Sequence, residues 1–174
     1  MKKILVMDAY NYSPDMEEIY RVAVRGIIFI DGKLLMVQSS FGELKLPGGG
    51  IDAGENEHQA LVREVKEETG YEVIPETIVP FGEIEEKRLS VHEPKIWHQF
   101  SRLYFCDVYP EQGDCDYTEN EKKYGFRQVL CTLDEALKIN EAMLEKEGKQ
   151  AWNQREYKTL LLVKEYLERP DNRE

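Results

Sequence analysis

The sequence predicts one domain of the α/β or α+β class, in which helices cover a β-sheet. Three observations lead to this expectation: a hairpin pattern in the first forty residues, a helical periodicity near residue 60, and a strand-then-helix order toward the C-terminus. The whole chain, residues 1–174, has the size of a single domain and is long enough to bury a core without disulfides.

Apolar runs separated by turn residues define the expected strands. The N-terminal run Met-Lys-Lys-Ile-Leu-Val-Met predicts a first strand. Residues 20–30 and 33–38 are apolar, β-branched runs joined by Asp31 and Gly32, and this dipeptide favours a hairpin because both of its residues tolerate positive φ. Further strands are expected at residues 77–88, 95–108 and 125–131.

Three helices are expected from apolar spacing and capping residues. Within residues 56–69, apolar side chains recur at intervals of three and four, and Gly70 lies where a left-handed cap ends a helix. Thr132 caps a second helix, and the last helix covers about residues 150–168. The polar, mostly acidic residues 114–123 are expected to form a loop.

The charge balance excludes some classes of partner. A net charge of −11 argues against binding duplex nucleic acid or an anionic membrane surface, since both need clustered Lys and Arg. No stretch approaches the roughly 18 apolar residues of a transmembrane helix. The three cysteines fit neither a disulfide framework nor a zinc site, which favours a reducing, cytoplasmic location.

The expected chemistry is concentrated in residues 49–71. Glu64, Glu67 and Glu68 fall within an arc of about 100° on the helix, where like charges repel by a few tenths of a kcal/mol each. Such a cluster is usually a solvated helix face. The three consecutive glycines at 48–50 favour a different interpretation, a loop that approaches a ligand closely in front of carboxylates that suit Mg²⁺ or Mn²⁺.

Residues 49–71 resemble the signature motif of the Nudix hydrolase family. Eight positions match at the correct spacing: Gly49, Glu55, Arg63, Glu64, Val65, Glu67, Glu68 and Gly70. Tyr71 stands where the family usually has an aliphatic residue. The resemblance implies the family's α/β/α sandwich around a mixed β-sheet, and the hydrolysis of a nucleoside diphosphate linked to another moiety.

The resemblance also implies roles for the matched residues. Glu64, Glu67 and Glu68, together with the Gly49 carbonyl, would bind the divalent cation, Mg²⁺ or Mn²⁺. Arg63 would hold the glutamates in place, and Glu55 would brace the junction of loop and helix.

The general base differs among family members, being a glutamate of the motif in some and a carboxylate of a later loop in others. Here Glu119 and Glu121 lie in the acidic loop. We prefer Glu121 because it is closer to the following strand, although an ordinary solvated loop explains both residues equally well.

Several other side chains are candidates for contact with the substrate. Gly48 and Gly49 would approach it through their backbone, and Lys45 directly precedes the glycine loop. Arg21 and Arg25 alternate with apolar residues and so share one sheet face, from which Arg25 could reach a phosphate. The aromatic residues Trp97, Phe100, Tyr104 and Phe105 could stack on a base, although core packing is their commoner role.

The substrate is inferred from subfamily marks. ADP-ribose enzymes of the family tend to carry a proline about 15 residues past the motif, and dinucleoside-polyphosphate enzymes a tyrosine slightly further on. Lys87 and the residues around it provide neither. This favours a MutT-like enzyme for nucleoside triphosphates, with those two activities as alternatives. A non-catalytic nucleotide sensor is the rival from another class, and the last helix could pack within a monomer or in a homodimer.

Overall fold

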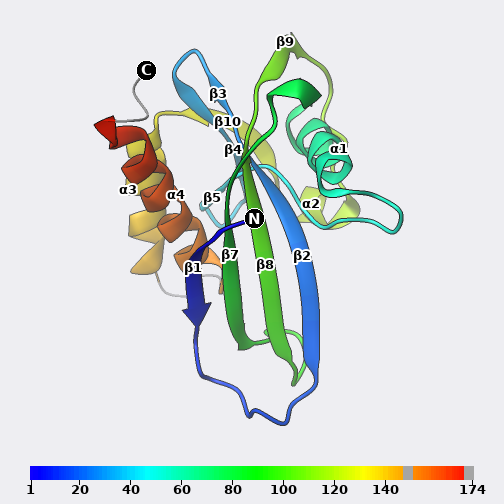
Figure 1. The fold of residues 1–174 in the computed structure, drawn as a ribbon, viewed down its shortest axis with the longest axis vertical. Coiled ribbons are helices and arrows are strands. Elements are labelled where there is room, and N and C mark those ends of the chain that lie inside the picture. Colours follow the sequence, from blue (N-terminus) through cyan, green and yellow to red (C-terminus); the bar gives the residue numbers. More distant parts are fainter. Residues whose placement is uncertain (147–150, 171–174) are drawn as a thin grey trace. The chain divides into compact units, whose positions relative to one another are not determined.

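The computed structural model of the protein describes residues 1–146 and 151–170, which divide into two compact units. The first unit comprises Met1–Ile28 and Pro47–Asp116, and the second comprises the described residues of Phe29–Leu46 and Tyr117–Glu174. Figure 1 shows the elements of both units in colours that follow the chain. The glycine loop and the acidic helix both belong to the first unit.

A four-stranded sheet forms the centre of the first unit. Its strands are β1 (Lys3–Asp8), β2 (Glu18–Ile27), β7 (Val79–Leu89) and β8 (Ile96–Phe105), in the order β1-β7-β8-β2. β7 and β8 are antiparallel, whereas β1 pairs with β7 and β2 with β8 in parallel (Figure 1). The sheet is therefore mixed, and the expected α/β fold with a mixed sheet is confirmed.

Helix α1 (Glu57–Thr69) contains the acidic cluster, and both of its ends are fixed by local contacts. Asn56 accepts the Gln59 N–H while the Gln59 side chain accepts the Asn56 N–H, which forms a capping box. Gly70 ends the helix with φ of 74°, as the sequence predicts. Next come the two-stranded sheet of β6 (Tyr71–Val73) and β9 (Val108–Gln112) and a short 3₁₀ turn, η1 (Pro75–Thr77).

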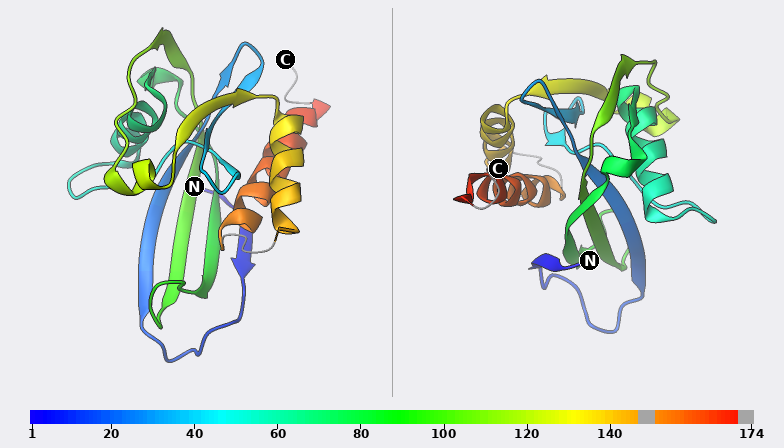
Figure 2. Two further views of the ribbon diagram at one scale, coloured as in Figure 1. Left: turned by 180° about the vertical axis from the view of Figure 1, so that it is seen from behind. Right: turned by 45° about the horizontal axis from the view of Figure 1, so that its top comes forward.

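The second unit combines a small antiparallel sheet with helices. β4 (Lys33–Gln38) pairs with β10 (Arg127–Cys131), β3 (Phe29–Ile30) and β5 (Leu44–Lys45). The β3–β4 hairpin is confirmed, with φ of 50° at Asp31 and 77° at Gly32. The helices are α2 (Glu119–Lys123), α3 (Leu133–Leu144) and α4 (Asn153–Glu168), and α3 and α4 lie side by side in every view (Figure 2).

Three expectations about the elements need correction. The strand expected at 20–30 is interrupted at Ile28, which leaves the short β3 as a separate element that pairs only with β4. The loop expected at 114–123 contains α2, because the Thr118 hydroxyl accepts the Glu121 N–H and caps a short helix. The last helix begins at Asn153, and residue 150 lies outside the described residues.

Apolar side chains from both units are fully buried, including Ile84 and Leu103 of the first sheet and Leu34 and Leu35 of β4. Polar side chains are buried as well: Glu86, Gln99 and Ser101 on the first sheet are each no more than 3% exposed. Within residues 1–146 and 151–170, no helix has the length and apolar character required to cross a bilayer.

Replacing Gly70 by alanine is expected to destabilise the fold. A Cβ atom there would lie 2.1 Å from the Gly113 carbonyl oxygen, in addition to the strain of the positive φ. Gly54 is the matched control, because its φ of +88° is also strained but nothing lies within 4 Å of its Cβ position. We expect Gly70→Ala to lower the melting temperature more than Gly54→Ala, by several degrees, in calorimetry. Equal losses would contradict the steric explanation.

Candidate active site

The glycine loop is held against the edge of β2 by backbone hydrogen bonds. The Gly26 N–H donates to the Pro47 carbonyl and the Val24 N–H to the Gly49 carbonyl, both at 2.9 Å. Gly48 has φ of +137°, and a Cβ atom there would lie 2.1 Å from the Val24 carbonyl oxygen. Only glycine allows this approach, so the loop is fixed beside the sheet by its backbone alone.

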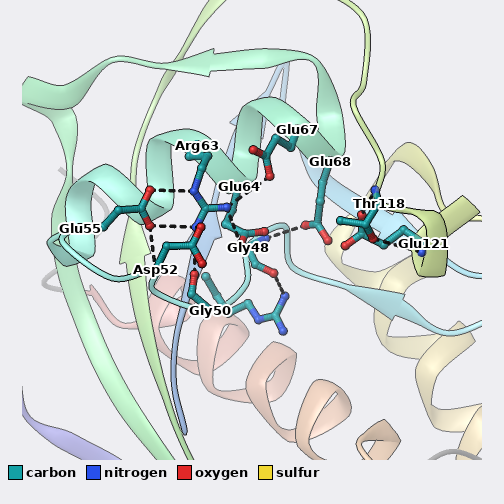
Figure 3. Close-up of polar contacts among 11 residues, drawn as sticks. Gly48, Gly50, Asp52, Glu55, Arg63, Glu64, Glu67, Glu68, Thr118 and Glu121 are labelled. Atoms are coloured by element: carbon teal, nitrogen blue, oxygen red, sulfur yellow. Dashed lines mark hydrogen bonds and ion pairs between the residues drawn. The ribbon is translucent and has the colours of Figure 1, made fainter.

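Arg63 connects the loop to the acidic helix and is the centre of the site (Figure 3). Its guanidinium forms a bidentate pair with Glu55, with Nε to Oε1 at 2.7 Å and Nη2 to Oε2 at 2.9 Å. Nη1 donates to Glu64 at 2.9 Å and to Glu67 at 3.2 Å, while Nη2 also donates to the Gly50 carbonyl at 3.1 Å. One cation therefore positions two carboxylates of the cluster and one carbonyl of the loop.

Glu55 is held as a carboxylate by its partners. The hydrogen bond from Arg63, followed by the one from the Asp52 backbone N–H at 3.0 Å, lowers the pKa of Glu55 to about 2. A folded-state pKa below the ordinary value contributes stability that is present above about pH 4.5 and lost as the pH falls toward 2. The Glu55–Arg63 pair thus stabilises the loop–helix junction at neutral pH.

Glu64 lies against the backbone of Gly49. A Cβ atom on Gly49 would stand 2.5 Å from the carboxyl carbon and from both carboxyl oxygens, so a side chain at position 49 would displace Glu64. Burial raises the pKa of Glu64 in spite of the nearby Arg63. Its Oε1 accepts from Arg63, and Oε2 has no hydrogen-bond partner among the described residues.

The other two glutamates of the cluster point to different partners. Glu68 is 5% exposed and accepts the Gly48 N–H at 2.7 Å, whereas Glu67 is more exposed and contacts Arg63. In this arrangement the three carboxylates do not converge, and in the part of the chain that the structure describes no three acidic, histidine or cysteine side chains are gathered as metal ligands.

The available donors nonetheless fit a hard cation by their chemistry. Glu64 offers carboxylate oxygens beside Gly49, whose carbonyl accepts one backbone hydrogen bond and retains a second lone pair. Glu67 offers two more carboxylate oxygens three residues along the same helix.

Arg25 lies at the loop as the sequence suggests. Its Nη1 donates to the Gly48 carbonyl, and it shares a face of β2 with Arg21. Arg21 approaches the loop too, with its Nη2 3.7 Å from the Cβ position of Gly50. Two cations of one strand thus flank the glycine loop.

Two predicted site residues belong to the second unit. The Lys45 ammonium lies 3.9 Å from the ring centre of Phe126 and 6.0 Å from that of Trp152, a cation–π arrangement. The Glu121 carboxylate accepts the Thr118 N–H at 2.8 Å and completes the capping box of α2. Their contact with substrate and their catalytic roles stay predictions.

A cavity of about 760 Å³ lies alongside α1 in the first unit. Arg63 lines it together with Val62, Pro75 and Tyr104, whereas Glu64, Glu67 and Glu68 do not. This cavity is therefore distinct from the carboxylate face of the helix.

The motif did not reveal every contact of the site. The Glu68–Gly48 hydrogen bond joins residues twenty positions apart, and the Arg21 approach to Gly50 depends on how the loop docks on β2. The alternation of arginines in β2 was the one available signal, since it placed Arg21 and Arg25 on one face.

Comparison with known proteins agrees with this geometry. Residues 19–154 match the model of the NUDIX domain, which covers more than half of the chain, and the protein belongs to this family. A NUDIX hydrolase from Nitrosomonas europaea has a similar fold, with a TM-score of 0.54 and 23% identity over 81% of this chain and 90% of that one. Enzymes of the family generally depend on divalent metals.

Two curated relatives are described as ADP-ribose pyrophosphatases. The Bacillus subtilis (strain 168) protein YjhB, to which that activity is assigned provisionally, is 28% identical over 102 residues, 58% of this chain and 48% of its own length. The Methanocaldococcus jannaschii ADP-ribose pyrophosphatase is 47% identical over 53 residues, 28% of this chain and 31% of its own length. The chain thus matches about half of one relative and a third of the other.

Glu55→Gln is expected to make the protein less stable at neutral pH and less sensitive to acid. The variant loses the charge that pairs with Arg63, so its stability should fall less between about pH 5 and pH 2 than that of the wild type, in which Glu55 also titrates. Urea unfolding at a series of pH values measures this. Parallel pH profiles for the two proteins would show that the ion pair does not stabilise the junction.

Proposed function

We propose that this chain is a divalent-metal-dependent pyrophosphohydrolase that cleaves a nucleoside diphosphate linked to another moiety. The observation that carries the proposal is the placement of the Glu64 carboxylate against the Gly49 backbone, with Arg63 fixing both the loop and the helix. Membership of the NUDIX family supports the same reaction class.

In this proposal Glu64, Glu67 and Glu68, with the Gly49 carbonyl, hold Mg²⁺ or Mn²⁺. The bound cation supplies charge neutralisation at the diphosphate and Lewis acidity toward the attacking water. Arg63 restricts the rotamers of Glu64 and Glu67 through hydrogen bonds from one guanidinium nitrogen, so little reorganisation is needed when substrate binds. Arg25, next to the Gly48 carbonyl, attracts the polyanion to an otherwise acidic protein.

We assign the proton-accepting role to a carboxylate, with Glu121 as the candidate outside the motif. Glu121 accepts the Thr118 N–H through Oε2, and its other oxygen, Oε1, has the lone pairs that a general base needs. A nucleophilic role for Cys106 is disfavoured, because burial raises the pKa of its thiol to about 12 and keeps it protonated.

The substrate class favoured by the relatives is ADP-ribose, since both curated relatives are described by that activity. The sequence itself favours nucleoside triphosphates, by the absence of subfamily marks around Lys87. We adopt ADP-ribose as the first substrate to test and a nucleoside triphosphate as the second. A non-catalytic sensor is disfavoured because all the glutamates of the motif are present.

A substrate panel with and without chelator tests the proposed function. The panel contains ADP-ribose, canonical and oxidised nucleoside triphosphates, and a dinucleoside polyphosphate, each with Mg²⁺ or with EDTA. We expect metal-dependent release of AMP from ADP-ribose. Release of pyrophosphate from nucleoside triphosphates, without hydrolysis of ADP-ribose, would identify triphosphates as the substrate class. Binding of a nucleotide without any turnover would favour the non-catalytic sensor.

Glu67→Gln is expected to lower kcat by about two orders of magnitude or more, because it removes a proposed metal ligand. The fold should remain intact, since among the described residues the Glu67 side chain accepts a single hydrogen bond, from Arg63 at 3.2 Å. Glu72→Gln is the matched control, as Glu72 forms only a 3.8 Å exposed pair with Lys66. Unchanged turnover in Glu67→Gln at saturating Mg²⁺ would refute the metal-ligand role.

A further inference from the structure

Trp97 in β8 has a hydrogen-bond donor with no acceptor. Its indole Nε1 is enclosed by the protein and has no hydrogen-bond partner among the described residues. An enclosed N–H without an acceptor is costly, and native structures rarely keep one unless a water or a ligand satisfies it. The Trp97 N–H is therefore a donor that the described side chains and backbone do not use.

Two arginines lie beside the same ring. The guanidinium carbons of Arg21 and Arg88 are each 5.6 Å from the ring centre of Trp97. The sheet order β7-β8-β2 places them on opposite sides of β8, one on each neighbouring strand. Arg88 also donates to Glu86 at 3.2 Å.

The strand pairing brings these groups to one face of the sheet. Trp97 is directly opposite Arg88 in the antiparallel β7–β8 pair, and Arg21 is level with Gln99, two residues along from Trp97. Arg25, four residues after Arg21 and on the same face of β2, donates to the Gly48 carbonyl. Three arginines and one glutamate, Glu86, thus lie on a face that extends to the glycine loop of an acidic protein.

We propose that Trp97, with Arg21 and Arg88, forms a specificity-determining subsite that binds oxygen atoms of the non-base part of the substrate, either a phosphate or a ribose. The subsite rests on the proposed function, because Arg21 also lies close to Gly50, at the end of the loop where the diphosphate would bind.

The chemistry of the three side chains selects this type of ligand. An indole N–H and two guanidinium groups are all donors and offer no acceptor. A nucleobase edge presents donors as well as acceptors, and none of these three side chains can accept a hydrogen bond from its donors. Phosphate and hydroxyl oxygens accept hydrogen bonds, and phosphate is also attracted by the two cations.

Trp97→Phe tests the N–H while it keeps an aromatic ring between the two arginines. We expect the KM for the substrate identified in the panel to rise about tenfold, with kcat nearly unchanged, because one hydrogen bond to the bound substrate is lost. Tyr12→Phe is the matched control, since it also removes one aromatic donor, whose acceptor is Asp8. Equal KM values in Trp97→Phe and Tyr12→Phe would overturn the subsite.

Fluorescence provides a readout that does not depend on catalysis. The chain has two tryptophans, so in a Trp152→Phe background all indole emission comes from Trp97. In EDTA, we would titrate this protein with inorganic pyrophosphate, ribose 5-phosphate and adenine. A response to pyrophosphate identifies phosphate as the ligand, and a response to ribose 5-phosphate alone identifies the sugar. A response to adenine alone, or to none of the three, overturns the subsite.

The two measurements separate the subsite from the proposed function. If no nucleotide is hydrolysed but Trp97 responds to pyrophosphate or ribose 5-phosphate, the proposed reaction fails and the subsite stands. If nucleotides are hydrolysed and neither Trp97→Phe nor the titrations show an effect, the subsite fails alone.

Discussion

The guanidinium of Arg63 is the interaction on which the candidate active site depends. Glutamates at positions 64 and 67 of one helix would repel each other, and Glu64 is buried as well. Arg63 offsets both effects with hydrogen bonds to each carboxylate, and its bidentate pair with Glu55 prevents the guanidinium from rotating away. Its bond to the Gly50 carbonyl ties the loop to the same charge.

The glycines of the loop complete this arrangement because they have no side chain. Gly48 contacts β2 with a backbone geometry that excludes a side chain, and Gly49 leaves the space that the Glu64 carboxylate occupies. The Gly48 N–H in turn donates to Glu68, a buried carboxylate whose burial is costly unless it accepts hydrogen bonds. Loop and helix are thus coupled through backbone groups as well as through Arg63, so the two segments that carry the proposed ligands are held together before any ligand arrives.

Charge is distributed unevenly in this protein. The chain is strongly acidic overall, yet the sheet face next to the loop carries Arg21, Arg25 and Arg88. The period of two in β-strands achieves this, since alternate residues of β2 point to the same side. An anionic substrate would meet cations at this face and be repelled over most of the remaining surface, which favours binding in one place.

The sequence by itself determined the elements that depend on neighbouring residues. Asp31 and Gly32 impose the hairpin because their backbone accepts positive φ, and Gly70 ends α1 for the same reason. The spacing from Glu55 to Glu68 identified the motif and its family. The prediction of a loop at residues 114–123 was wrong. This acidic segment resembles a loop, but Thr118 caps the short helix α2 within it.

Only the tertiary structure decided the contacts that join distant segments. Helical periodicity could not show that Glu68 is buried, because burial depends on the docking of the Gly48 backbone. Nor could it place Arg88 and Arg21 beside Trp97, because these residues come from three strands whose register is fixed by sheet pairing. Side-chain periodicity gives the face of a strand, whereas hydrogen-bond register between strands decides which residues of that face become neighbours.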